Sequence, residues 1–160
     1  MTDSRMTDWE QITAAVTTTM GGDAEGGRAA LTRCWEATGP DDHAARCVLA
    51  HYLADVVPDL ADEITWDERA LAEFASVGRS DLSAVGIADT RLLAPSLHLN
   101  LGDGYLRAGR PDDARRALAE GYAAVGLLPD DGYGEMIRRG LDGLAARIDP
   151  VAAAADDPSD

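Results

Sequence analysis

The chain has 160 residues, which is enough for one domain with a hydrophobic core. It carries 29 acidic residues against 14 basic ones, and its formal net charge is −15. Such a charge repels phosphate backbones and anionic lipid headgroups before any specific contact forms. We therefore expect neither nucleic acid nor a membrane surface as a partner.

No apolar stretch approaches the roughly 18 residues that a bilayer span needs. The short polar N-terminus is not followed by an apolar segment, so we expect no secretory signal. The two cysteines, Cys34 and Cys47, lie in apolar helical segments without a CxxC spacing. That context favours buried reduced thiols over a disulfide or a zinc site, and it predicts a cytoplasmic protein.

Four helices are predicted in the first half of the chain. They cover residues 9–20, 23–38, 43–56 and 58–74. Asp8 is the candidate N-cap of the first helix, and Asp41 or Asp42 caps the third. Pro58 fits the first turn of the fourth helix, where its missing N–H costs no hydrogen bond.

Residues 77–92 show no strong period and are expected to form a connecting loop with one short turn. Helices resume after Pro95, and three more are predicted. They begin near residues 95, 111 and 132, and the last one ends at Asp149-Pro150. No segment alternates with a period of two, so the fold class is all-α. We expect one domain over 8–148, with residues 1–7 and the acidic tail 149–160 disordered.

The sequence repeats itself at two offsets. An offset of 53 superposes Tyr52-Leu53 on Tyr105-Leu106 and Pro58-Asp59 on Pro111-Asp112. An offset of 87 places Leu31 on Leu118, with matching small residues around it. The two offsets differ by 34 residues, and a fixed offset of this size is typical of repeat architectures.

The third predicted helix pair carries the clearest repeat pattern. Its residues are Leu101-Gly102, Tyr105, Gly109, Ala114 and Leu118. With the offset of 34, this pattern resembles the tetratricopeptide repeat, in which small residues let paired helices approach closely. The resemblance covers roughly residues 8–126. It implies an α-solenoid of three antiparallel helix pairs, with an insertion before the third pair and 132–148 as a capping helix.

The resemblance implies a concave groove, lined by the first helix of each pair, that binds a protein or peptide. Carried over by position, the groove residues are His43, Arg46, Ser96, Asn100, Asp103 and Arg107. Asn100 occupies a place where chaperone-binding members of the family clamp a peptide with asparagine, and Arg46 would supply a cation beside it. Alternatively, both residues pair within the scaffold. A homodimer through the apolar face of the first pair also stays open.

The alternative function is a small-molecule-binding or catalytic protein with a His/Asp pocket. Its residues would be His51, Asp55, Trp66, Asp67, His98 and Tyr133. No nucleophile, phosphate loop or cofactor motif accompanies them, so we assign no catalytic residue and expect no cofactor. His43, Cys47, His51 and Asp55 recur every four residues, but the outer members of that series lie too far apart on a helix to share one metal ion. At most a neighbouring pair of them could bind a metal together with His98, and we assign no metal site.

Overall fold

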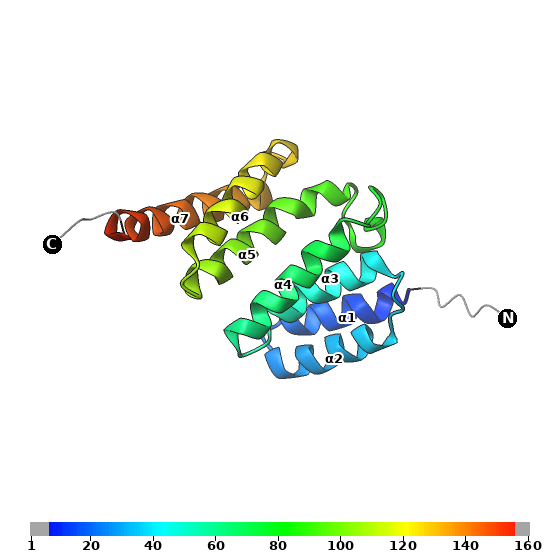
Figure 1. Ribbon diagram of the computed structural model, residues 1–160. Helices are drawn as coiled ribbons and strands as arrows, with labels where there is room; N and C mark the ends of the chain where they lie inside the picture. The colour runs from blue at the N-terminus through cyan, green and yellow to red at the C-terminus, as the bar shows by residue number, and fades with distance from the viewer. Residues whose placement is uncertain (1–6, 156–160) are drawn as a thin grey trace. The chain divides into compact units, whose positions relative to one another are not determined.

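The computed structural model of the protein describes residues 7–155. Within this range the chain forms seven α-helices and no strand (Figure 1), which confirms the all-α fold class. None of these helices is long and apolar enough to cross a membrane. The chain divides into two compact units, one ending at Thr90 and the other beginning at Arg91. The single domain predicted over 8–148 stays a prediction.

The first unit contains two helix pairs. Its helices are α1 (Trp9–Met20), α2 (Ala24–Ala37), α3 (His43–Ala54) and α4 (Leu60–Phe74). Helix α1 packs on α2 and α3 packs on α4, while α2 also contacts α3 (Figure 1). Trp9 and His43, the first residues of the two pairs, are 34 positions apart, which is the difference between the two offsets found in the sequence.

Aspartate side chains cap the first turns of three of these helices, α1, α2 and α4. The Asp8 carboxylate accepts a hydrogen bond from the backbone N–H of Gln11, which confirms the predicted cap of α1. Asp59 accepts from the N–H groups of the first turn of α4. Pro58 therefore precedes the cap of α4, and the prediction that it lies in the first turn is wrong.

Helix α3 is the central helix of the first unit. Eight of its twelve residues are buried, and α1, α2 and α4 all contact it. Its apolar residues, such as Val48, Leu49 and Leu53, are spread around the helix instead of forming one stripe. This distribution suits a helix that is covered by neighbours on several sides.

The connecting segment contains two 3₁₀ turns, although the sequence predicted one. They are η1 (Ser83–Val85) and η2 (Thr90–Leu93). The buried hydroxyl of Thr90 donates a bifurcated hydrogen bond to the carbonyl oxygens of Gly78 and Arg79, at 2.7 and 2.9 Å. Thr90 thereby closes the segment into a compact loop.

The second unit contains α5 (Ala94–Arg107), α6 (Pro111–Ala124), η3 (Val125–Leu127) and α7 (Gly132–Ala155). The three α-helices contact one another pairwise. A Cβ atom on Gly102 would lie 2.7 Å from Leu144 Cδ2 and 3.4 Å from the Cβ of Ala117. Glycine at this position therefore permits the close approach of α5 to α6 and α7, as the repeat pattern predicted for the helix pair.

The last helix does not stop at Asp149-Pro150 as predicted. Helix α7 continues through Pro150 to Ala155. Proline removes one hydrogen bond, but its fixed φ is close to the helical value, and four of the next five residues are alanine, the best helix former. Helix replaces the predicted disorder over 149–155. Residues 1–6 and 156–160, also predicted to be disordered, lie outside the described residues.

Candidate functional site

The six predicted groove residues are divided between the two units. His43 and Arg46 lie on α3 of the first unit, and the other four, Ser96, Asn100, Asp103 and Arg107, lie on α5 of the second. The two halves of the predicted groove have different surroundings.

Arg46 is engaged on three sides within the first unit. Its Nε donates to the Glu73 carboxylate at 3.0 Å, and Nη1 donates to the Thr38 hydroxyl at 3.3 Å. The guanidinium carbon lies 4.0 Å from the centroid of the Trp35 ring, a cation–π contact. Trp35 in turn meets Trp66 edge to face, with ring centroids 4.9 Å apart. Arg46 thus pairs within the scaffold and ties α2, α3 and α4 together.

His43 shares the same carboxylate. Its Nδ1 lies 2.6 Å from Glu73 Oε2. Burial alone would raise the pKa of Glu73, but the hydrogen bonds and positive charges of His43 and Arg46 outweigh it and hold the pKa below its ordinary value. Both groove candidates on α3 are therefore bound to one ionised carboxylate on α4.

The four candidates on α5 form a row. Ser96, Asn100, Asp103 and Arg107 are spaced by four, three and four residues, which places them on one face of the helix. The Asp103 carboxylate accepts from Arg107 Nε at 2.9 Å and from Arg147 Nη1 on α7 at 2.7 Å. Burial raises the pKa of Asp103, but the two arginines outweigh this effect and lower it. Arg107 and Arg147 thus both bond to the Asp103 carboxylate, and Arg147 connects α7 to α5 at this end of the row.

Helix α7 borders the row along its length. The side chains of Ser96 and Tyr133 are hydrogen-bonded at one end. Midway, a Cβ atom on Gly140 would lie 2.6 Å from Leu99 Cδ2, so the missing side chain lets Leu99 pack against α7. Arg147 borders the other end through its bond to α5.

We call this two-helix face the α5–α7 surface. It consists of Ser96, Asn100, Asp103 and Arg107 from α5, and of Tyr133, Met136, Gly140 and Arg147 from α7. The groove prediction missed the α7 members, although Tyr133 was placed in the alternative pocket. A signal for them exists in the sequence, because Tyr133, Met136, Gly140 and Arg147 recur at helical spacing on one side of the last helix.

The residues of the alternative pocket also fall in both units. His51, Asp55, Trp66 and Asp67 belong to the first unit, and His98 and Tyr133 belong to the second. His51 is 8 % exposed, and burial lowers its pKa to about 4, so the imidazole is neutral at pH 7. Its Nδ1 is buried without a hydrogen-bond partner among the described residues. An acid–base role requires contact with a substrate, and this burial does not provide it.

Metal coordination also lacks a geometric basis in the part of the chain that the structure describes. Residues 7–155 contain no group of three or more His, Cys, Asp or Glu side chains that could hold an ion. Along α3, Cys47 and His51 are buried, and His43 is bonded to Glu73. The regular spacing of these residues in the sequence therefore reflects their position on a central helix.

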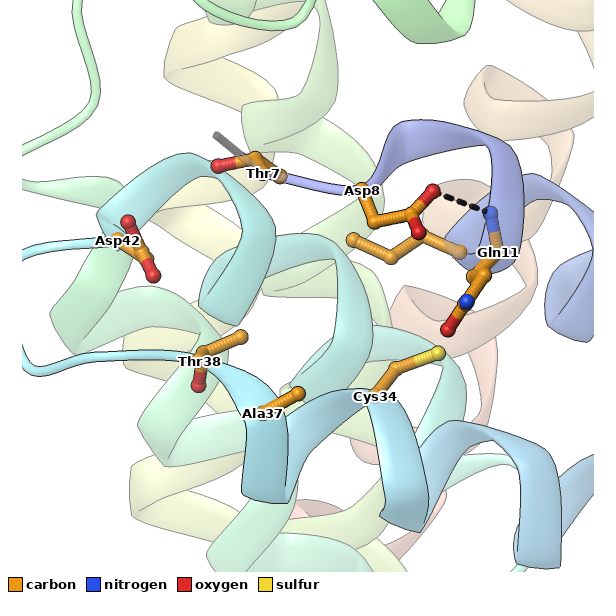
Figure 2. A pocket seen from close by; sticks show the side chains of 8 residues that line it. Thr7, Asp8, Gln11, Cys34, Ala37, Thr38 and Asp42 are labelled. Atoms are coloured by element: carbon orange, nitrogen blue, oxygen red, sulfur yellow. Dashed lines mark hydrogen bonds between the residues drawn. The ribbon is translucent and has the colours of Figure 1, made fainter. Parts of the chain in front are cut away.

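A cavity of about 240 Å³ lies at the edge of the first unit, between the start of α1, the end of α2 and the start of α3 (Figure 2). Asp8 and Asp42 border it, but both carboxylates already bind backbone N–H groups, those of Gln11 and Gly39. Burial, with a smaller effect of the Asp8 charge, raises the pKa of the Cys34 thiol in its wall. A neutral thiol is a poor nucleophile, so this cavity has no activated group.

Comparison with protein-family models, with curated proteins and with solved structures found no match to this chain.

Proposed function

We propose that the protein is a non-catalytic binding module of helical-repeat type, similar to tetratricopeptide proteins, whose ligand is a protein segment bound along the α5–α7 surface. A cytoplasmic location, expected from the sequence, belongs to the same proposal. The ligand would lie beside α5 in the place that the resemblance gives to the groove.

The observation that carries this proposal is the intact row on α5 with α7 beside it. Four of the six predicted groove residues stay on one helix face, and Arg147 and Tyr133 border both ends of that row. In contrast, His43 and Arg46 are held by Glu73. The α5–α7 surface therefore offers polar side chains from two adjacent helices to a ligand lying across them.

Asn100 is central to this interpretation. It is half-buried near the middle of the row, one turn from Asp103. Its amide both donates and accepts hydrogen bonds, so it matches the N–H and C=O groups of an extended peptide backbone. Removing the amide would leave ligand backbone groups unpaired in a partly desolvated place, which costs binding free energy.

The experiment is selection from a displayed random-peptide library on the purified protein, followed by calorimetry with the enriched peptides. We expect related sequences to be enriched and Asn100→Ala to weaken their binding by about tenfold. Thr17→Ala is the control, because Thr17 is exposed on α1 and bonds only its own helix. Absence of enrichment, or equal affinities for the two variants, would refute the proposal.

A further inference from the structure

The cavity between α1, α2 and α3 has no part in the proposed function (Figure 2). All of its lining residues belong to the first unit, so none of them is shared with the α5–α7 surface. Its volume of about 240 Å³ is below the roughly 300–1,000 Å³ of sites for drug-sized ligands. A ligand bound here therefore has to be a small molecule.

Two carboxylates line this cavity, and neither has a cationic partner among the described residues. Asp8 and Asp42 each use one oxygen to accept a backbone N–H, from Gln11 at 3.1 Å and from Gly39 at 2.8 Å. Within residues 7–155, no arginine or histidine forms an ion pair or a hydrogen bond with either carboxylate. Their second oxygens, Asp8 Oδ2 and Asp42 Oδ1, are thus left to accept hydrogen bonds from a ligand.

An apolar wall separates the two carboxylates. In Figure 2, Asp8 and Asp42 lie on opposite sides of the cavity, with Cys34 and Ala37 of α2 between them. Ile12 also lines the cavity and is only 3 % exposed. Burial and the Asp8 charge raise the pKa of the Cys34 thiol, so the thiol is neutral and the field of Asp8 reaches the wall. A ligand that contacts both carboxylates therefore needs an apolar middle.

The charges at the cavity favour an organic cation. The residues of the described chain that line it include two aspartates and no basic residue, and the whole chain carries a net charge of −15, which concentrates cations near its surface. A metal ion fits poorly, because residues 7–155 contain no group of three His, Cys, Asp or Glu side chains that could hold one. An ammonium group has three N–H donors for oxygen acceptors, and the side chains of Gln11 and Thr38 supply neutral ones beside the carboxylates.

We propose that this cavity binds a small organic diammonium ion, the protonated form of a diamine with a short alkyl chain. One ammonium group binds Asp8 and the other binds Asp42, while the alkyl chain lies on the wall formed by Ile12, Cys34 and Ala37. This site goes beyond the proposed function, and it does not depend on whether the α5–α7 surface binds a peptide.

The affinity of this site should be modest. Asp8 and Asp42 are the N-cap residues of α1 and α3, so both carboxylates already interact with the positive ends of these helices. This interaction reduces the free energy that each carboxylate gains from a ligand. We therefore expect a dissociation constant of about 1 mM, which an NMR titration can measure.

The test is an NMR titration of the full, ¹⁵N-labelled chain with linear diaminoalkanes of increasing chain length at constant ionic strength. We expect one chain length to bind best, with backbone shifts concentrated in residues 8–12, 34–38 and 42. The monoamine of the same length leaves one carboxylate unpaired and should bind about tenfold more weakly. The uncharged diol of the same length should not bind measurably. A monoamine or a diol that binds as tightly as the diamine would overturn the proposal.

Asparagine variants remove the carboxylate charges but keep the helix caps. Asp8→Asn and Asp42→Asn retain an oxygen that can accept the same backbone N–H, and each should weaken binding of the best diamine by about fivefold or more. Asp23→Asn is the matched control, because Asp23 caps α2 through Gly26 in the same way but does not line the cavity. It should change the affinity by less than about twofold. Equal effects of the three variants would show that only the overall charge attracts the diamine, and the proposal would be wrong.

Alkylation of Cys34 gives a second readout of occupancy. Cys34 lines the cavity, whereas Cys47 is fully buried, so iodoacetamide should modify Cys34 first. A saturating concentration of the best diamine should slow this modification by about fivefold, and the diol should not slow it. An unchanged rate of alkylation at a diamine concentration that saturates the NMR shifts would place the diamine outside this cavity and overturn the proposal.

Discussion

The arginines at the two halves of the predicted groove have opposite surroundings. Arg46 in the first unit is 24 % exposed and contacts a carboxylate, a hydroxyl and an indole ring. Arg147 in the second unit is 51 % exposed and bonds to the Asp103 carboxylate. The N–H donors and the stacking face of the Arg46 guanidinium group contact neighbouring helices and hold them together. An arginine that is half-exposed can still donate hydrogen bonds to a ligand. The same residue type thus has a structural role in one unit and a candidate binding role in the other.

The largest expected effect is on the free energy of unfolding, and it distinguishes the structural role of Arg46 from the candidate binding role of Arg147. Arg46→Ala leaves the partly buried Glu73 without its arginine and uncovers Trp35, so it should lower the free energy of unfolding by about 2 to 3 kcal/mol. Arg147→Ala removes a more exposed ion pair and should cost less than about 1 kcal/mol. Urea denaturation followed by circular dichroism measures both values. Equal losses would mean that the two arginines do not differ in role.

Within the second unit, stability should depend on the close packing of α5 at Gly102. Gly102→Leu places a side chain against Leu144 and should lower the free energy of unfolding by about 1 to 3 kcal/mol. Gly143→Leu on α7 is the matched control, because a Cβ atom there would meet nothing within 4 Å. Because leucine is a better helix former than glycine, this exposed substitution should raise the free energy of unfolding by about 0.5 to 1 kcal/mol. A stabilising Gly102→Leu would contradict the packing described for α5, α6 and α7.

A pH dependence follows from Glu73. Its pKa is lowered in the folded protein, so its stabilising contribution is present above the unfolded-state value of 4.5 and is lost as pH falls through the folded value. Glu73→Gln should therefore cost about 1 kcal/mol near pH 7, and the difference from the wild type should shrink below about pH 4. Chemical denaturation at both pH values measures this difference. A constant difference would show that the charge of Glu73 is not what holds His43 and Arg46.

The smallest expected effect concerns ionic strength. Because the chain carries a net charge of −15, a peptide with one carboxylate but a net positive charge should bind more tightly than a net negative one. Raising the salt concentration from about 50 mM to about 500 mM should weaken the binding of the positively charged peptide by a few-fold. Calorimetry at both salt concentrations gives the comparison. An affinity that does not change with salt would show that long-range electrostatic attraction does not contribute to peptide binding.

Local signals predicted the helices well. Asp8 before an apolar stripe and the Gly21-Gly22 pair after it defined α1, because caps and breakers act within one turn. The two errors at prolines have a local cause as well. At Pro58 the cap at Asp59 decided the start of α4, and at Pro150 the following alanines favoured continued helix.

The side-chain partners were not predictable in the same way. Glu73 is 27 residues from Arg46, and Asp103 is 44 residues from Arg147. Helical periodicity places each of these residues on a face of its own helix, but it does not say which face of another helix lies opposite. The row on α5 was therefore predictable from spacing, whereas its completion by α7 required the packing of the second unit.

The most direct test of the central claim is an NMR titration of the uniformly labelled protein with the best peptide from the library. The account predicts that backbone shifts concentrate in residues 96–107 and 133–147, and that the side-chain signals of Asn100 and Arg147 shift while that of Arg46 does not. Shifts confined to α1–α4, or a shifted Arg46 with an unchanged Arg147, would contradict the assignment of binding to the α5–α7 surface.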